Sequence, residues 1–105
     1  TDLSLDCAQA GRWFFSDEIY HGLTYSQEAT SALQVGDHDR LIVMNSFSKY
    51  FSMTGWRIGY TAAPPEMAAA TAKIQSHTTS NATTFAQYGA LEALRISRAR
   101  VSGYA

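Results

Sequence analysis

Three short apolar runs in the chain have the composition of buried strands. They are the aromatic run Arg12–Ser16, the aliphatic run Leu41–Met44 and the segment Arg57–Ala62. Leu41–Met44 lacks polar alternation, which is typical of a parallel strand covered on both faces. The link between the second and third runs, about residues 46–56, is shorter than a parallel crossover requires. We therefore expect the third strand to be antiparallel to the second if the two are neighbours.

The polar and apolar pattern also predicts helices on both sides of these strands. Leu3–Ala10 is a short, ambiguous apolar pattern, which Gly11 would end. Pro64-Pro65-Glu66 has the proline and the acid of a helix start, and we expect that helix to run to about Gln75. A polar stretch then precedes a final helix, predicted from about Thr84 to Ile96. Its apolar face would contain residues spaced at helical intervals, namely Phe85, Tyr88, Leu91 and Leu94.

Composition limits the classes of protein to which the chain can belong. It has 105 residues, of which 46% are apolar and 16% charged, as expected for one globular domain or part of one. The net charge of −1 provides no electrostatic attraction for nucleic acid or an anionic membrane, so we expect neither partner. The single cysteine, Cys7, excludes an intrachain disulfide and fits a reducing compartment, which we expect to be the cytoplasm. Because the chain starts at Thr1 without Met, we expect a fragment of a longer protein.

The run SFSKYFSMTGWRIGY contains the most distinctive candidate chemistry. Lys49 lies three residues after Ser46 and eight residues before Arg57, in a turn between two apolar segments. An amine beside hydroxyls and a fixed cation suits a lysine that holds an anionic aldehyde cofactor as a Schiff base. The ordinary alternative is a solvated surface lysine, like the only other lysine, Lys73.

Asp17 and Tyr20 are candidates at the end of the first predicted strand. Asp17 could be an Asx-turn residue or a helix N-cap. It could also be a buried carboxylate that keeps a pyridine nitrogen protonated, which makes the ring an electron sink. Tyr20 could bond a phenolic oxygen on the same ring or could be a half-buried core tyrosine. Ser46 and Arg57 could hold phosphate or could be a strand-end turn residue and a surface arginine.

Two segments together resemble the signature regions of the class I/II aminotransferases, which are fold type I pyridoxal-phosphate enzymes. They are SDEIYHG, residues 16–22, and NSFSKYFSMTGWRIGY, residues 45–60. The second is the more specific, and the resemblance in order and spacing extends to about Leu94. It implies that the chain is the central fragment of the large cofactor-binding domain, with residues 1–105 forming part of that domain. The implied fold class is α/β, a mostly parallel sheet with flanking helices.

The resemblance also implies a role for each candidate residue. Lys49 would be the catalytic residue that forms the internal aldimine and moves the substrate proton. Asp17 would pair with the pyridine nitrogen, and Tyr20 would bond the ring oxygen. Ser46 and Arg57 would bind phosphate, with Ser48 as a weaker candidate. The implied cofactor is pyridoxal 5′-phosphate, with an amino acid and a 2-oxo acid as substrates and no metal.

The chain departs from the family pattern in the parts that complete such a site. We can assign no segment to the upstream phosphate-binding helix, the upstream asparagine at the ring oxygen, or the downstream arginine that binds the substrate carboxylate. The resemblance implies a homodimer for the full-length parent, and we expect the isolated fragment to be inactive. Other pyridoxal-phosphate chemistries remain as alternatives: C–S β-lyase, decarboxylase or cyclopropane-forming synthase. A further alternative is the sensor domain of a transcriptional regulator.

Overall fold

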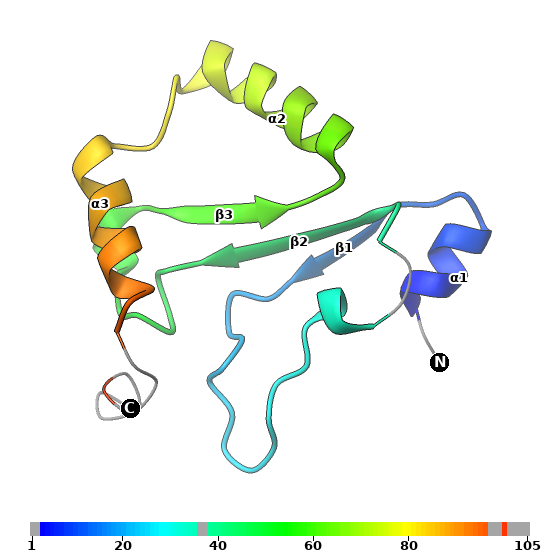
Figure 1. The fold of residues 1–105 in the computed structure, drawn as a ribbon, viewed down its shortest axis with the longest axis horizontal. Helices are drawn as coiled ribbons and strands as arrows, with labels where there is room; N and C mark the ends of the chain where they lie inside the picture. The colour runs from blue at the N-terminus through cyan, green and yellow to red at the C-terminus, as the bar shows by residue number, and fades with distance from the viewer. Residues whose placement is uncertain (1–2, 36–37, 97–99, 101–105) are drawn as a thin grey trace.

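A computed structural model describes residues 3–35, 38–96 and 100 of the chain. Its centre is a three-stranded sheet in the order β1–β2–β3, formed by Phe14–Asp17, Leu41–Ser46 and Gly59–Ala62 (Figure 1). β1 and β2 are parallel, with Asp17 opposite Met44. β2 and β3 are antiparallel, as the short link between them predicts, with Ser46 opposite Gly59. The α/β class is therefore confirmed.

Within the described residues, three α-helices accompany the sheet, and their bounds differ modestly from the prediction. α1 covers Leu3–Gln9 and is followed by Gly11 in the left-handed conformation (φ 67°), as predicted. α2 covers Pro65–Thr78, with proline at its first position. It continues three residues past Gln75, and within this polar end the Thr78 hydroxyl donates to the Ile74 carbonyl one turn before it.

α3 covers Thr84–Ala93 and ends three residues before the predicted position. Arg95 N–H and Ile96 N–H each donate to the carbonyl three residues before, so the chain tightens after Ala93. Two short 3₁₀ helices complete the described elements, η1 at Ala32–Gln34 and η2 at Thr54–Trp56. No helix in the described residues is long and apolar enough to cross a membrane.

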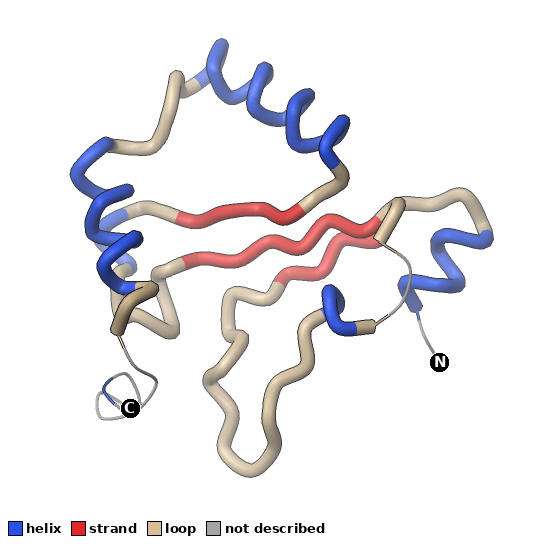
Figure 2. Tube along the Cα trace, in the orientation of Figure 1, coloured by secondary structure: helices blue, strands red, loops and turns tan. Residues whose placement is uncertain are grey.

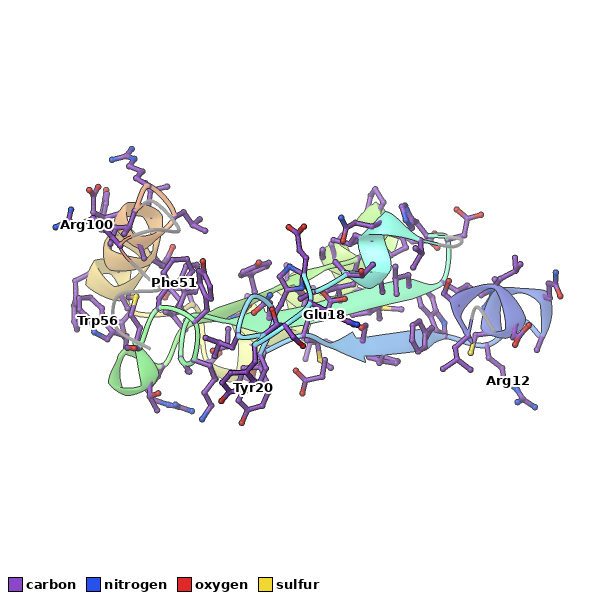
Figure 3. The ribbon with its side chains drawn as sticks, turned by 90° about the horizontal axis from the view of Figure 1, so that it is seen from below. Arg12, Glu18, Tyr20, Phe51, Trp56 and Arg100 are labelled. Carbon is purple, nitrogen blue, oxygen red and sulfur yellow. The ribbon has the colours of Figure 1, made fainter. Side chains whose placement is uncertain are left out.

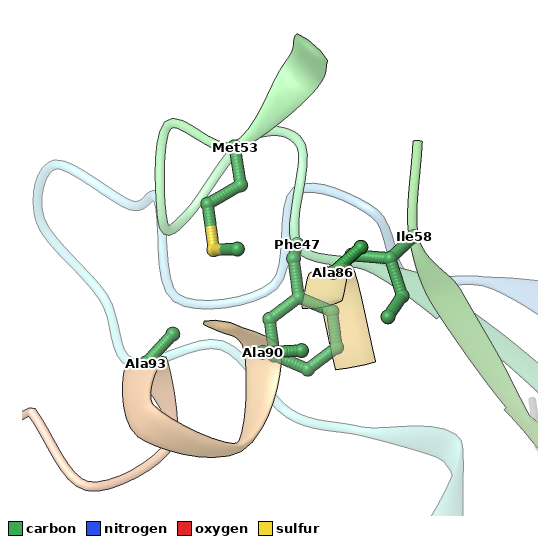
Figure 4. Close-up of a cluster of buried hydrophobic side chains, with 6 residues drawn as sticks. All are labelled: Phe47, Met53, Ile58, Ala86, Ala90 and Ala93. Carbon is green, nitrogen blue, oxygen red and sulfur yellow. The ribbon is translucent and has the colours of Figure 1, made fainter. Parts of the chain in front are cut away.

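The core cluster packs α3 against the loop that joins β2 to β3 (Figure 4). It consists of Phe47, Met53, Ile58, Ala86, Ala90 and Ala93. The prediction that Phe85 and Tyr88 lie on the packed face of α3 is therefore wrong, since these side chains are 70% and 71% exposed. Alanines form the inner face because they let the helix backbone approach the Phe47 ring closely.

The molecule is flat, with principal extents of 42 × 41 × 18 Å. β2 is the buried strand, with its first three residues nearly inaccessible to solvent. β1 does not match the prediction of a buried strand, because its side chains alternate and Phe15 is 58% exposed. α2 buries none of its residues and extends away from the sheet in Figure 2, so it does not cover β2.

Candidate functional site

The sheet brings the candidate residues together at one end. β1 and β2 both finish there, at Asp17 and Ser46, and β3 begins there at Gly59 (Figure 1). Ligands of open α/β sheets bind at the carboxyl ends of parallel strands. The link between β2 and β3 places Lys49 and Arg57 beyond this same end.

Ser46 and Ser48 form a hydroxyl pair within that link. The Ser46 Oγ lies 2.9 Å from Ser48 Oγ and 3.1 Å from the Ile58 carbonyl oxygen, and it accepts a bond from Ser48 N–H at 3.1 Å. The Thr54 hydroxyl donates to the Ser48 carbonyl at 2.8 Å. These bonds hold the turn on both sides of Lys49, and Ser48 is buried.

Lys49 is exposed and lies beside Tyr20. Its Nζ is 5.7 Å from the centroid of the Tyr20 ring, a cation–π distance between residues from different segments. The structure therefore brings together two residues that the sequence places 29 positions apart. Tyr20 itself is mostly exposed, so it is not the half-buried core tyrosine of the alternative interpretation.

Arg57 has a backbone conformation that is uncommon for a residue with a side chain. Its φ of 53° and ψ of 48° lie in the left-handed region, where it ends η2. One guanidinium nitrogen donates to the Thr54 carbonyl at 3.0 Å, so the side chain folds back toward the turn that carries Lys49. The group is exposed, and a guanidinium has five N–H donors, so this bond uses only a part of its capacity.

Asp17 corrects one expectation. Its carboxylate is exposed and accepts a hydrogen bond from Ile19 N–H at 3.2 Å, which is an Asx turn. The expected burial of this carboxylate is therefore wrong for this structure, because Asp17 is exposed at the end of β1. The residue still lies at the same sheet end as Ser46.

Two features escaped the sequence interpretation. Glu18 contacts residues on both sides of the loop that leaves β1, whereas its sequence position beside Asp17 suggested no role. Gly22 lies against the Tyr50 ring so closely that a Cβ there would be 2.8 Å from a ring carbon. In the sequence, the position of Gly22 a few residues after Asp17 and Glu18 is the only indication of the contact with Tyr50, and it is a weak one.

The histidines form no metal centre in the described part of the chain, where no three metal-ligating side chains gather. His21 lies in the loop that leaves β1, with its Nδ1 4.0 Å from Glu18 Oε2. His77 lies within α2. A cavity of about 250 Å³ lies between the loop that leaves β1 and the link from β2 to β3. Among the candidate cofactor residues, only Ser46 lines this cavity.

The donor set fits an anionic aldehyde cofactor. Two hydroxyls and two side-chain cations surround one turn, at Ser46, Ser48, Lys49 and Arg57. This combination suits a phosphate group and an aldehyde carbon. The acid at Asp17 lies on the neighbouring strand, where it would suit a pyridinium nitrogen. The residues present therefore fit pyridoxal phosphate.

This α/β sheet, with its lysine and hydroxyl cluster at the strand ends, has the architecture of the fold type I aminotransferases. The chain belongs to the aminotransferase class I and II family, which matches residues 2–102. The resemblance drawn from the sequence is thereby confirmed.

Individual relatives agree with this assignment. The chain is 51% identical to an aspartate aminotransferase of Thermotoga maritima over 80% of its own length and 22% of that protein's. It is 47% identical to a probable aspartate/prephenate aminotransferase of Aquifex aeolicus, over 85% and 23% of the two lengths. The crystal structure of the Thermotoga maritima aspartate aminotransferase superposes with a TM-score of 0.87 and 44% identity, over 95% of this chain and 27% of that one. The chain thus spans about a quarter of the length of these relatives.

Proposed function

We propose that the full-length protein is a pyridoxal-phosphate-dependent aminotransferase and that residues 1–105 are part of its large cofactor-binding domain. The observation that carries this proposal is that Lys49 lies beside Tyr20 and directly follows Ser48 of the Ser46–Ser48 hydroxyl pair, in a chain of this family. The family as a whole uses pyridoxal phosphate. An amino acid and a 2-oxo acid would be the substrates.

Each candidate residue would have a defined role. Lys49 would bind the aldehyde carbon of the cofactor through its amine and later move the proton at the substrate Cα. Ser46, Ser48 and Arg57 would hold the phosphate, with Arg57 contributing a fixed positive charge. Asp17 would stabilise the protonated pyridine nitrogen, and Tyr20 would donate to the ring oxygen. When bound, the cofactor supplies an electron sink for negative charge at the substrate Cα.

The alternative chemistries have less support. Three relatives of 46–51% identity have names of transaminases, for aspartate, for aspartate or prephenate, and for asparagine with an oxo acid. None of these three relatives is named as a lyase, a decarboxylase, a synthase or a regulator. The three substrates differ among relatives of similar identity, so the region shared with this chain does not select one. A homodimer and a cytoplasmic location remain part of the proposal.

The test uses reduction with borohydride. The full-length protein is incubated with pyridoxal phosphate, reduced, digested and mapped by mass spectrometry. We expect a phosphopyridoxyl group on Lys49, which the Lys49→Ala variant loses. Lys73→Ala is the matched control and keeps the label, because Lys73 lies on α2. A label on Lys73 with none on Lys49 would contradict the proposal.

A further inference from the structure

Glu18 is a nearly buried carboxylate that the proposed function does not use. Its side chain is only 11% exposed, although it directly follows the last residue of β1. A carboxylate in such a position is unfavourable unless it accepts hydrogen bonds. Figure 3 shows Glu18 near Tyr20, in the loop that leaves the sheet.

The contacts of Glu18 join three parts of the chain. Its Oε1 accepts a bond of 2.7 Å from Ala32 N–H, the first residue of η1 and 14 positions away. The same oxygen accepts from the Ser16 hydroxyl at 3.1 Å. Its backbone N–H donates to the Met44 carbonyl of β2 at 2.8 Å. Glu18 therefore fixes both ends of the loop over residues 19–31 to the end of the sheet.

The first turn of that loop carries Tyr20 and is held from both sides. The His21 N–H donates to the Glu18 carbonyl at 2.9 Å, and the Leu23 N–H donates to the Tyr20 carbonyl at 3.0 Å. Gly22 packs against the ring of Tyr50, the neighbour of Lys49. The backbone bond of Glu18 to Met44 holds the start of the loop, and its carboxylate ties Ala32, at the far end of the loop, to the turn that carries Tyr20.

We infer that Glu18 is a positioning residue that keeps the Tyr20 ring against the Lys49 amine. The contact itself is independent of cofactor, whereas its role in preparing Lys49 for the cofactor aldehyde rests on the proposed function. Loss of the Glu18 carboxylate releases Ala32 N–H and the loop, and Tyr20 then spends less time beside Lys49.

The chain provides an internal standard for the test, because Lys49 and Lys73 are its only lysines. The cofactor-free full-length protein is treated briefly with trinitrobenzenesulfonate, and the Lys49 to Lys73 modification ratio is measured by peptide mass spectrometry. We expect Glu18→Ala to raise this ratio about two- to fivefold, the range of an exposed cation–π contact. Tyr20→Leu has the same effect, and the double variant is no higher than either single variant, because both act on one contact. Glu66→Ala, in the first turn of α2, is the matched loss of an acid and leaves the ratio unchanged.

Glu18→Gln retains an acceptor oxygen for Ala32 N–H and keeps the protein testable if Glu18→Ala does not fold. Its ratio falls between those of the wild type and Tyr20→Leu. An unchanged ratio in Glu18→Gln and Glu18→Ala overturns the inference, and so do additive effects of Glu18→Ala and Tyr20→Leu. With pyridoxal phosphate bound, Glu18→Gln and Tyr20→Leu shift the visible absorption maximum in the same direction. If wild-type Lys49 takes no borohydride label, the proposed function fails, whereas the cofactor-free ratio still decides the positioning role.

Discussion

Substitution of Arg57 tests whether this residue binds the phosphate of the cofactor, separately from the other residues that would contact the cofactor. Arg57→Ala removes a guanidinium that would form charge-assisted hydrogen bonds, each worth about 1.5–3 kcal/mol. We expect the dissociation constant for pyridoxal phosphate to rise about 10- to 150-fold in the full-length protein. Titration followed by absorbance or fluorescence measures the change.

The matched ligand in this experiment is pyridoxal, which lacks the phosphate. Its affinity should be the same in the wild type and in Arg57→Ala. Arg12→Ala provides a control variant, because Arg12 lies at the far end of the molecule from Trp56, the neighbour of Arg57 (Figure 3). Equal losses for the two ligands would show that Arg57 supports the fold of the turn and does not hold phosphate.

At the residue scale, the sequence predicted which candidate residues lie near one another better than it predicted their burial. The spacing of Ser46, Lys49 and Arg57 pointed to one connection between strands, and the structure places Ser46 at the end of β2 and the other two between β2 and β3. The burial of Asp17 was wrong, because exposure depends on what packs over the strand end and not on local sequence. Glu18 was missed for a related reason, since its partner Ala32 is 14 positions away and an alanine N–H has no sequence signal.

At the scale of elements, the close pairing of β2 and β3 supports the turn between them. A Cβ on Gly59 would lie 2.7 Å from the backbone oxygen of Asn45, which cannot rotate away as a side chain can. We expect Gly59→Ala to separate the strands beside Ser46 and to lower the free energy of unfolding by about 1–3 kcal/mol. Urea unfolding followed by circular dichroism measures this loss.

Gly55→Ala is the matched control for that variant. Gly55 lies in η2, and a Cβ there would meet no atom within 4 Å. Its unfolding free energy should stay within about 0.5 kcal/mol of the wild type, as for most surface substitutions. If the two glycine variants are equally stable, the strands can separate at little cost, and the close approach does not support the site.

Elements were predictable where a local rule decides them. The length of the link between β2 and β3 was enough to predict antiparallel pairing, and Gly11 was enough to end α1. The inner face of α3 was not predictable by hydrophobicity, which favours Phe85 and Tyr88 over Ala86 and Ala90. The close approach of the helix to Phe47 selects small residues, and that approach is a tertiary property.

At the scale of the whole molecule, the exposed outer face of α3 leads to a prediction for the 105 residues in isolation. Tyr88 and Leu91 are exposed there on successive turns, while the alanine face packs inward. Exposed apolar area is worth about 25 cal/mol per Å² when it becomes covered. We therefore expect the isolated chain to self-associate, and Tyr88→Ser with Leu91→Ser to raise the dissociation constant at least about tenfold.

Sedimentation velocity over a concentration series measures this association. Ile74→Ser on α2 removes an exposed apolar side chain similar in size to Leu91. It should change the dissociation constant of self-association much less than the α3 double variant does. Circular dichroism should show the same helix content in all variants, because Ala86, Ala90 and Ala93 are untouched. Equal effects of the α2 and α3 substitutions would mean that total apolar exposure, and not the outer face of α3, drives the association.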